Sequence, residues 1–302
     1  MAGETMVRTS RKDAVNAEIK LPAPGRCIYC GDPNADTDEH IIPRGLNGLV
    51  VWKDASCKRC AAITSRFEGD VLGGFLKKPR TALNMKSYRK KAKTIRTQVK
   101  QDDGSFVDVD LPRNEYPVLL ALPVFTVPPV MSGEKFDQGR PLRIALQNPA
   151  VDLDGNPFVP QQGMTIQEIA PLRIGSFMRM LAKIAHGTAA TTFGEEYEPL
   201  LVDYILTGEP DMSDYIGTEE EDPDAEQWLG ATAVGSVAPE LPDHILVGIK
   251  ILNGPAYLVV PGKFRPKGWQ AMAPAAFQEL LDNRVLEAID RLPERPLFDP
   301  TA

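Results

Sequence analysis

Residues 27–60 read CIYCGDPNADTDEHIIPRGLNGLVVWKDASCKRC, and this stretch decides the fold. It holds all four cysteines of the chain in two pairs, Cys27 with Cys30 and Cys57 with Cys60, with two residues inside each pair. Four thiolates at this spacing suit the closed tetrahedral geometry of a structural zinc site. Thiol redox chemistry is the alternative, but it normally uses one such pair rather than two. We therefore expect structural Zn²⁺ held by the four cysteines.

The rest of the chain reads as a soluble protein. Its 302 residues suffice for one large domain or two ordinary ones. No apolar run approaches the roughly 18–20 residues that span a bilayer, so we expect no membrane segment. The first 24 residues lack the apolar core of a signal peptide. We therefore expect a cytoplasmic protein, a compartment where paired cysteines favour metal over disulfide.

The charge is distributed unevenly. The net charge is −7, yet residues 1–113 hold 21 Lys and Arg against 14 Asp and Glu, while the remainder holds 13 against 27. A basic segment attached to an acidic body is typical of nucleic-acid binding. We divide the chain into a flexible arm (residues 1–25), a cysteine-bearing module with a basic extension (26–113) and an α+β domain of unknown role (114–302).

Between the cysteine pairs, residues 37–48 read TDEHIIPRGLNG, an acidic residue directly before a histidine. Residues 49–52 can return as a second strand, and a helix is expected from about residue 58 to 71. This order resembles the His-Asn-His (HNH) endonucleases, whose ββα-metal fold joins a hairpin to a helix. Phage junction resolvases of that family also carry two zinc knuckles at similar spacing. The resemblance covers roughly residues 26–70 and implies a zinc-stapled ββα-metal module within an α+β chain.

Hydrolysis of a phosphodiester requires a base for water and a cation for the developing charge. Histidine titrates near neutrality, so His40 is the expected general base. A divalent cation such as Mg²⁺ can neutralise the phosphate and stabilise the leaving oxygen. We assign Glu39 as its ligand, with Asp38 as the fallback carboxylate. Arg44, just after Pro43, is expected to contact the scissile phosphate and counts with the catalytic residues.

Two positions depart from the family pattern. The middle asparagine, which fixes the histidine-bearing loop in the family, has no counterpart, and Asp54 is the nearest substitute. The residue after the last cysteine, which usually completes the metal site, is Ala61. Ser65 and Glu68 share its helix face. Glu68 begins roughly 10 Å further along the axis, so it is either a displaced metal ligand or an exposed helix carboxylate.

Basic side chains continue from the motif into the run KSYRKKAK of residues 86–93. Lys and Arg contacts to phosphates supply most sequence-independent affinity for DNA, so we expect little sequence specificity. The expected contact residues are Arg44, Lys58, Arg59, Arg66, Lys77, Lys78, Arg89, Lys90 and Lys91.

The remaining sequence indicates further strands and helices. Hairpins are expected over residues 94–100 with 106–111 and over 245–252 with 257–260. Helices are expected over about 170–185, stopped by Gly187, over 197–206 and over 275–292. His186, expected to cap the end of the first of these helices, and His244 read as structural.

The favoured function is a metal-dependent endonuclease that hydrolyses DNA, and the resemblance implies 3′-hydroxyl and 5′-phosphate products. The alternative is a catalytically inactive HNH-fold zinc module that binds nucleic acid. A third hypothesis gives the C-terminal domain an activity of its own. That domain could also supply regulation or an oligomer contact. Nucleases fused to a sensing domain occur in bacterial defence, a role suggested here by architecture alone.

Overall fold

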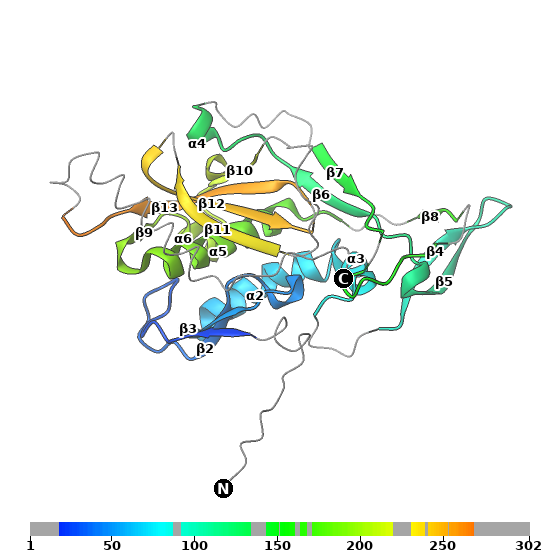
Figure 1. Ribbon diagram of the computed structural model, residues 1–302, viewed down its shortest axis with the longest axis horizontal. Helices are drawn as coiled ribbons and strands as arrows, with labels where there is room; N and C mark the ends of the chain where they lie inside the picture. Colours follow the sequence, from blue (N-terminus) through cyan, green and yellow to red (C-terminus); the bar gives the residue numbers. More distant parts are fainter. Residues whose placement is uncertain are drawn as a thin grey trace, which may run out of the picture.

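The computed structural model describes residues 18–86, 92–133, 143–150, 152–160, 164–167, 171–219, 231–238, 241–252 and 254–268. Within them the chain has a mixed α+β fold (Figure 1). In chain order the elements are β1 (Ile19–Leu21), β2 (Thr37–His40), η1 (Arg44–Leu46), β3 (Val50–Ser56), α2 (Lys58–Leu72), α3 (Lys77–Ala82), β4 (Thr94–Lys100), β5 (Phe106–Pro112), η2 (Arg113–Glu115), β6 (Leu120–Val124), α4 (Pro129–Ser132), β7 (Arg143–Gln147), β8 (Ile166–Gln167), α5 (Ile174–Phe193), η3 (Gly194–Glu196), β9 (Tyr197–Pro199), α6 (Val202–Thr207), η4 (Ser213–Tyr215), β10 (Ile216–Thr218), β11 (Ala231–Ala238), β12 (Leu241–Ile251) and β13 (Ala256–Phe264).

The cysteine-bearing segment folds as an antiparallel hairpin followed by a helix. Strand β3 pairs with β2, so that Glu39 lies opposite Trp52 and His40 opposite Val51. Helix α2 begins directly after its N-cap residue, Cys57. Its buried positions recur every three or four residues, at Cys60, Thr64, Phe67 and Val71. This spacing gives α2 one apolar face, which packs toward the core.

Part of the expected flexible arm is ordered. Residues 19–21 form β1, which pairs in parallel with residues 50–52 of β3. The Trp52 Nε1 donates a hydrogen bond to the Pro22 carbonyl at 2.8 Å. The expectation of a free arm is therefore wrong for these residues, because the outer edge of β3 offers backbone groups for pairing. Residues 1–17 lie outside the described part.

Helix α5 joins the two halves of the chain. One side of it contacts α2, and the other contacts the sheet ordered β10-β13-β12-β11, as Figure 1 shows. Strand β9 pairs with the end of β13. A helix packed on two sides is expected to be apolar nearly all round, and α5 is buried at most positions from Phe177 to Ala189. This placement brings residues of the second half against the cysteine-bearing hairpin.

The longest helix extends further than the sequence pattern predicts. We expected an end near Gly187, whereas α5 continues to Phe193. A Cβ atom on Gly187 would come within 3.0 Å of the Ile41 side chain. This glycine therefore permits close packing against the loop after His40, rather than ending the helix. Gly194, with φ of 55°, is the C-cap residue instead.

The other predicted elements have mixed outcomes. The hairpins β4–β5 and β12–β13 are confirmed. The helix expected over residues 197–206 is wrong in its first part, because Tyr197–Pro199 extend the sheet as β9 and only α6 is helical. The expected helix over residues 275–292 lies outside the described part of the chain.

A single buried apolar cluster runs through the described residues, from Cys27 beside the hairpin to Phe264 in β13. The segments on either side of residue 113 share this core, because α5 packs on both. The boundary drawn there stays a prediction. Among the described residues, no helix combines the length and apolar character needed to cross a bilayer.

Candidate functional site

The four cysteines converge at one end of the hairpin–helix unit. Their sulfur atoms all lie within 4.8 Å of one another, and the Sγ atoms of Cys30 and Cys57 are 3.7 Å apart. The first pair sits in a turn closed by a hydrogen bond from the Gly31 N–H to the Cys27 carbonyl at 2.9 Å. Gly31 has φ of 74°, a conformation that glycine adopts without strain. The second pair lies on the N-cap and first turn of α2.

The four thiols of this cysteine cluster are suited to holding a cation. Three of the four cysteines, Cys27, Cys57 and Cys60, are buried. Burial raises the pKa of the Cys27 and Cys60 thiols, so without a cation these groups stay protonated at neutral pH. A metal ion ligated by sulfur would stabilise the thiolates and release their protons. The residues present therefore fit a tetrahedral metal site.

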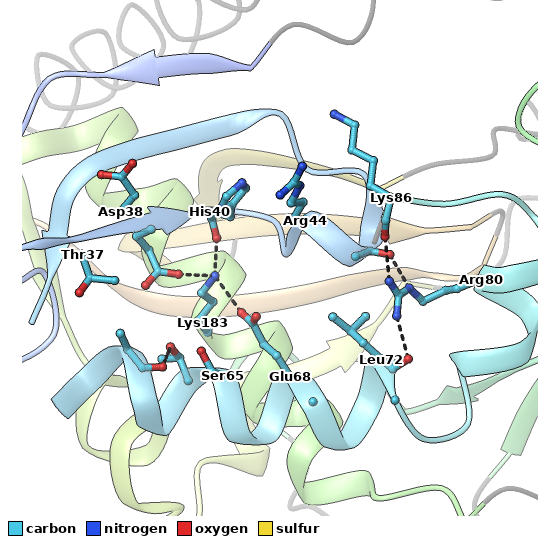
Figure 2. A pocket seen from close by; sticks show the side chains of 16 residues that line it. Thr37, Asp38, His40, Arg44, Ser65, Glu68, Leu72, Arg80, Lys86 and Lys183 are labelled. Atoms are coloured by element: carbon cyan, nitrogen blue, oxygen red, sulfur yellow. Dashed lines mark hydrogen bonds and ion pairs between the residues drawn. The ribbon is translucent and has the colours of Figure 1, made fainter. Parts of the chain in front are cut away.

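A pocket of about 530 Å³ lies beside the hairpin, between β2, α2 and the loop after His40 (Figure 2). It brings together residues from both halves of the chain. Its lining residues are Thr37, Asp38, Glu39, His40, Arg44, Gly45, Ala61, Thr64, Ser65, Glu68, Gly69, Leu72, Gly73, Arg80, Lys86 and Lys183. Most of the motif residues singled out in the sequence, including His40, Glu39 and Arg44, therefore meet in one concave site.

Two carboxylates converge on one buried lysine. The Lys183 Nζ lies 2.6 Å from Glu39 Oε1 and 3.0 Å from Glu68 Oε1, as Figure 2 shows for Glu68. It also donates hydrogen bonds to the carbonyl oxygens of His40 and Ile41. Side chains alternate along β2, so the Glu39 carboxylate points toward Lys183, whereas the His40 side chain points to the opposite side of the strand, the side on which Arg44 lies (Figure 2). The reading of Glu68 as an exposed helix carboxylate is wrong, since only 19% of its side chain is accessible.

Lys183 is the main site residue that sequence reasoning missed. Only 1% of its side chain is accessible. Burial opposes its charge, but the carboxylates of Glu39 and Glu68 outweigh this effect and raise its pKa to about 12. Burial raises the pKa of Glu68, while Lys183 opposes that shift. The signal available in the sequence was a lysine inside an otherwise apolar helical run, a position that is rarely filled unless the charge is paired.

The catalytic divalent metal implied by the family resemblance does not fit these residues. Glu39, its expected ligand, is engaged by Lys183, as is Glu68. Ala61 lines the same pocket, and its methyl side chain has no atom that can coordinate a metal. An ammonium group thus occupies the space between the two carboxylates.

His40 lines the pocket one residue beyond Glu39. Burial lowers the pKa of His40; Lys183 and Arg44 act in the same direction, while Glu18 opposes them. Its Nε2 is buried, lies 3.7 Å from Glu18 Oε1 and makes no hydrogen bond within the described residues. The imidazole is therefore neutral at pH 7, the form that accepts a proton.

In the contact between Asp38 and Asp54, the carboxylate that accepts a backbone hydrogen bond is that of Asp38. We expected the Asp54 carboxylate to fix the loop, whereas the Asp54 backbone N–H donates to Asp38 Oδ1 at 3.1 Å. Asp54 has φ of 47° at an irregularity in the pairing of β2 with β3. Both side chains are exposed, and Asp54 does not line the pocket. The contact ties the open end of the hairpin.

The loop that carries Arg44 is held by two residues that sequence reasoning did not single out. Asn47 Oδ1 accepts a hydrogen bond from the Lys86 backbone N–H at 2.8 Å. The Arg80 guanidinium donates to the carbonyls of Gly45, Leu72 and Lys86 at 2.5, 2.7 and 3.1 Å. Burial lowers the pKa of Arg80 to about 10, so it stays charged at neutral pH and fixes the loop.

The expected nucleic-acid contacts are distributed unequally. Arg44 lines the pocket together with Lys86. Lys58 pairs with Asp36 at 2.9 Å, with both side chains well exposed. Arg59, Arg66 and Lys77 are exposed on α2 and α3, Lys78 is half-buried, and none of them lines the pocket. Arg89, Lys90 and Lys91 lie outside the described residues.

The other two histidines play no part in the pocket. His186 lies inside α5 rather than at its end, so the expected cap is wrong. Its Nδ1 pairs with the Tyr197 hydroxyl at 3.0 Å and its Nε2 with the Ile28 carbonyl at 2.9 Å. Burial lowers its pKa to about 4. His244 lies in β12 beside Asp243.

Comparisons of the chain with protein-family models, curated proteins and solved structures find no match.

Proposed function

We propose that this protein is an HNH-type endonuclease that hydrolyses the phosphodiester bonds of DNA at the pocket beside His40. The observation that carries the proposal is the meeting of His40, Arg44 and Lys86 in one pocket. This pocket lies on a hairpin–helix unit whose four cysteines cluster at one end. The order of these elements agrees with the family resemblance.

The cysteine cluster is proposed to hold one structural Zn²⁺. Four sulfur ligands leave no open position for water, so the ion stabilises the fold and takes no part in hydrolysis. By joining the turn before β2 to the first turn of α2, it fixes the two walls of the pocket relative to each other. His40 lies on one wall, and Glu68 lies on the other.

His40 is proposed to take a proton from the attacking water. The water oxygen then forms a bond to phosphorus, while the bond from phosphorus to the 3′-oxygen breaks. The leaving oxygen takes a proton from solvent, which gives the 3′-hydroxyl and 5′-phosphate. An imidazole that is neutral at pH 7 is the form that can accept this proton.

Arg44 and Lys86 are proposed to bind the phosphate. Burial lowers the pKa of Lys86; Glu18 opposes this shift, and Arg44 adds to it. Two cations close enough to disfavour each other's charge form a site that an anion stabilises. An Arg side chain can also contact two phosphate oxygens at once. These contacts carry no base information, so the proposed nuclease has little sequence specificity.

Replacing His40 by alanine tests the proposal. We expect plasmid cleavage by the His40→Ala variant to fall about 100-fold or more, the typical contribution of a general base. His244→Ala is the matched control, because His244 lies outside the pocket, and it should cut like the wild type. Equal zinc content and thermal midpoints would exclude misfolding. Undiminished cutting by His40→Ala would sink the assignment.

The pH dependence gives a second test of the base. Glu18 raises the pKa of His40 against the effect of burial, so Glu18→Gln should lower that pKa further. Cleavage requires neutral His40, and the acidic limb of the rate profile should therefore move to lower pH. The His40 ring resonances, followed by NMR titration, should move in the same direction. Glu195→Gln, an exposed carboxylate change on η3, should leave both unchanged, and an unshifted limb in Glu18→Gln would contradict the role of Glu18.

A non-catalytic module that binds nucleic acid is the second candidate, and one observation favours it: Glu39 and Glu68 are already engaged by Lys183. This candidate predicts DNA binding that weakens with salt, together with no cleavage under any metal condition. Comparison of the wild type with His40→Ala separates the two candidate functions. A non-catalytic module would bind DNA equally in both proteins and cleave it in neither.

A further inference from the structure

We infer that Lys183 is a resident cation that takes the place of the divalent metal in this pocket, so that the site works without Mg²⁺ or Mn²⁺. This inference rests on the proposed function for its chemical meaning. The geometry behind the inference does not depend on any activity, because it concerns only which cation the carboxylates of Glu39 and Glu68 hold.

The oxygen atoms that could bind a metal already surround the ammonium group. Lys183 Nζ lies 2.6 Å from Glu39 and 3.0 Å from Glu68, and it donates to the carbonyl of His40 (Figure 2). Carboxylate and carbonyl oxygens are the ligands that hard divalent cations prefer. A divalent ion on these oxygens would lie within a few ångströms of a buried ammonium, where like charges repel strongly.

Lys183 is held in place from both sides along its helix. Seven residues before it, Ser176 Oγ donates to Asp70 Oδ2 of α2 at 3.0 Å. Three residues after it, His186 pairs with the Ile28 carbonyl at 2.9 Å. Gly187 then allows the helix to pack closely on Ile41. These contacts fix the backbone of α5 against the hairpin and α2. The position of the Lys183 ammonium group is therefore fixed by the packing of the helix.

Ala61, at the position that usually completes the metal site in the family, supports the same inference. Ala61 lies on the pocket wall formed by α2, between Cys60 and the carboxylate of Glu68. The alanine side chain contributes no ligand atom, and the exposed Asp38 carboxylate accepts the Asp54 backbone N–H. A metal between β2 and α2 would therefore depend on the two carboxylates that Lys183 engages. In this arrangement the phosphate charge is met by Arg44 and Lys86, which line the same pocket. The second half of the chain therefore completes the site that the first half begins.

Mn²⁺ binding to the full-length, zinc-loaded protein tests the inference without any activity measurement. Electron paramagnetic resonance would follow free Mn²⁺ during titration of the wild type, Glu39→Gln, Lys183→Met and Lys183→Met/Glu39→Gln. We expect the wild type and Glu39→Gln to bind Mn²⁺ equally weakly. Lys183→Met should gain one site about tenfold tighter or more, a change of about 1.4 kcal/mol. The double variant should lose that site.

A wild-type Mn²⁺ site that Glu39→Gln weakens about tenfold or more would overturn the inference, because a metal would then hold the carboxylate. The same holds if a folded Lys183→Met gains no site. Should Lys183→Met fail to fold, the comparison of the wild type with Glu39→Gln still decides. Absence of DNA cleavage would reject the proposed function and leave the Mn²⁺ result unaffected.

Discussion

Replacement of Cys60 by serine is expected to unfold the hairpin–helix unit. Cys60 is fully buried within the core that continues into α5 and the five-stranded sheet. Structural zinc contributes about 10–16 kcal/mol in zinc-finger peptides, which is comparable with the whole stability of about 5–15 kcal/mol of a typical protein. Loss of one ligand, or removal of the ion by a strong chelator, should therefore abolish cooperative unfolding of this region.

Elemental analysis and thermal denaturation followed by circular dichroism check this expectation. The wild type should contain one zinc per chain, and Cys60→Ser should contain much less. Ala62→Ser is the control, because it introduces the same hydroxyl at an exposed position two residues further along α2. A zinc-free wild type that a chelator leaves unchanged but a thiol reductant destabilises would instead indicate redox chemistry at the cysteines.

Replacement of Lys183 by methionine should have the second-largest effect, a loss of about 3–5 kcal/mol in the free energy of unfolding. Methionine fills a similar volume but leaves the Glu39 and Glu68 carboxylates buried without a cation. Removal of one partner from a buried ion pair is costly for this reason, whereas replacement of all members by neutral groups is often tolerated. The variant Lys183→Met/Glu39→Gln/Glu68→Gln should therefore recover much of the loss.

Urea denaturation at pH 7 measures both variants, with the midpoint and slope analysed together. Lys77→Met is the matched control, since Lys77 is exposed on α3, and surface changes usually stay within about 0.5 kcal/mol. A Lys183→Met variant as stable as Lys77→Met would show that the two carboxylates need no cation.

Much of the local structure could be predicted from sequence because short-range patterns determine it. The alternating stretches that form β4–β5 and β12–β13 are followed by turn residues, and both hairpins occur as expected. The cysteine spacing likewise predicts the cluster. The predicted end of α5 was wrong because a glycine in a helical pattern indicates a helix stop unless a neighbour is known to pack against it. Ile41, which is that neighbour, is remote in sequence.

The candidate site divides in the same way. Local sequence placed Glu39 next to His40 and suggested a metal between Glu39 and the helix. It did not indicate that Glu18, directly before β1, approaches His40, or that Asn47 and Arg80 hold the Arg44 loop. Each of these contacts joins segments whose separation in sequence has no fixed period, so no spacing rule reveals it.

By itself, the sequence determined the cysteine cluster and the hairpin–helix unit around it, because two closely spaced cysteine pairs and alternating strands act over short distances. Only the tertiary structure decided which cation lies between Glu39 and Glu68. Lys183 lies 144 positions after Glu39 in the sequence. It reaches the pocket because α5 packs on both α2 and the sheet. A buried charge is stable only when it is paired, and the tertiary packing determines which charged group pairs with it.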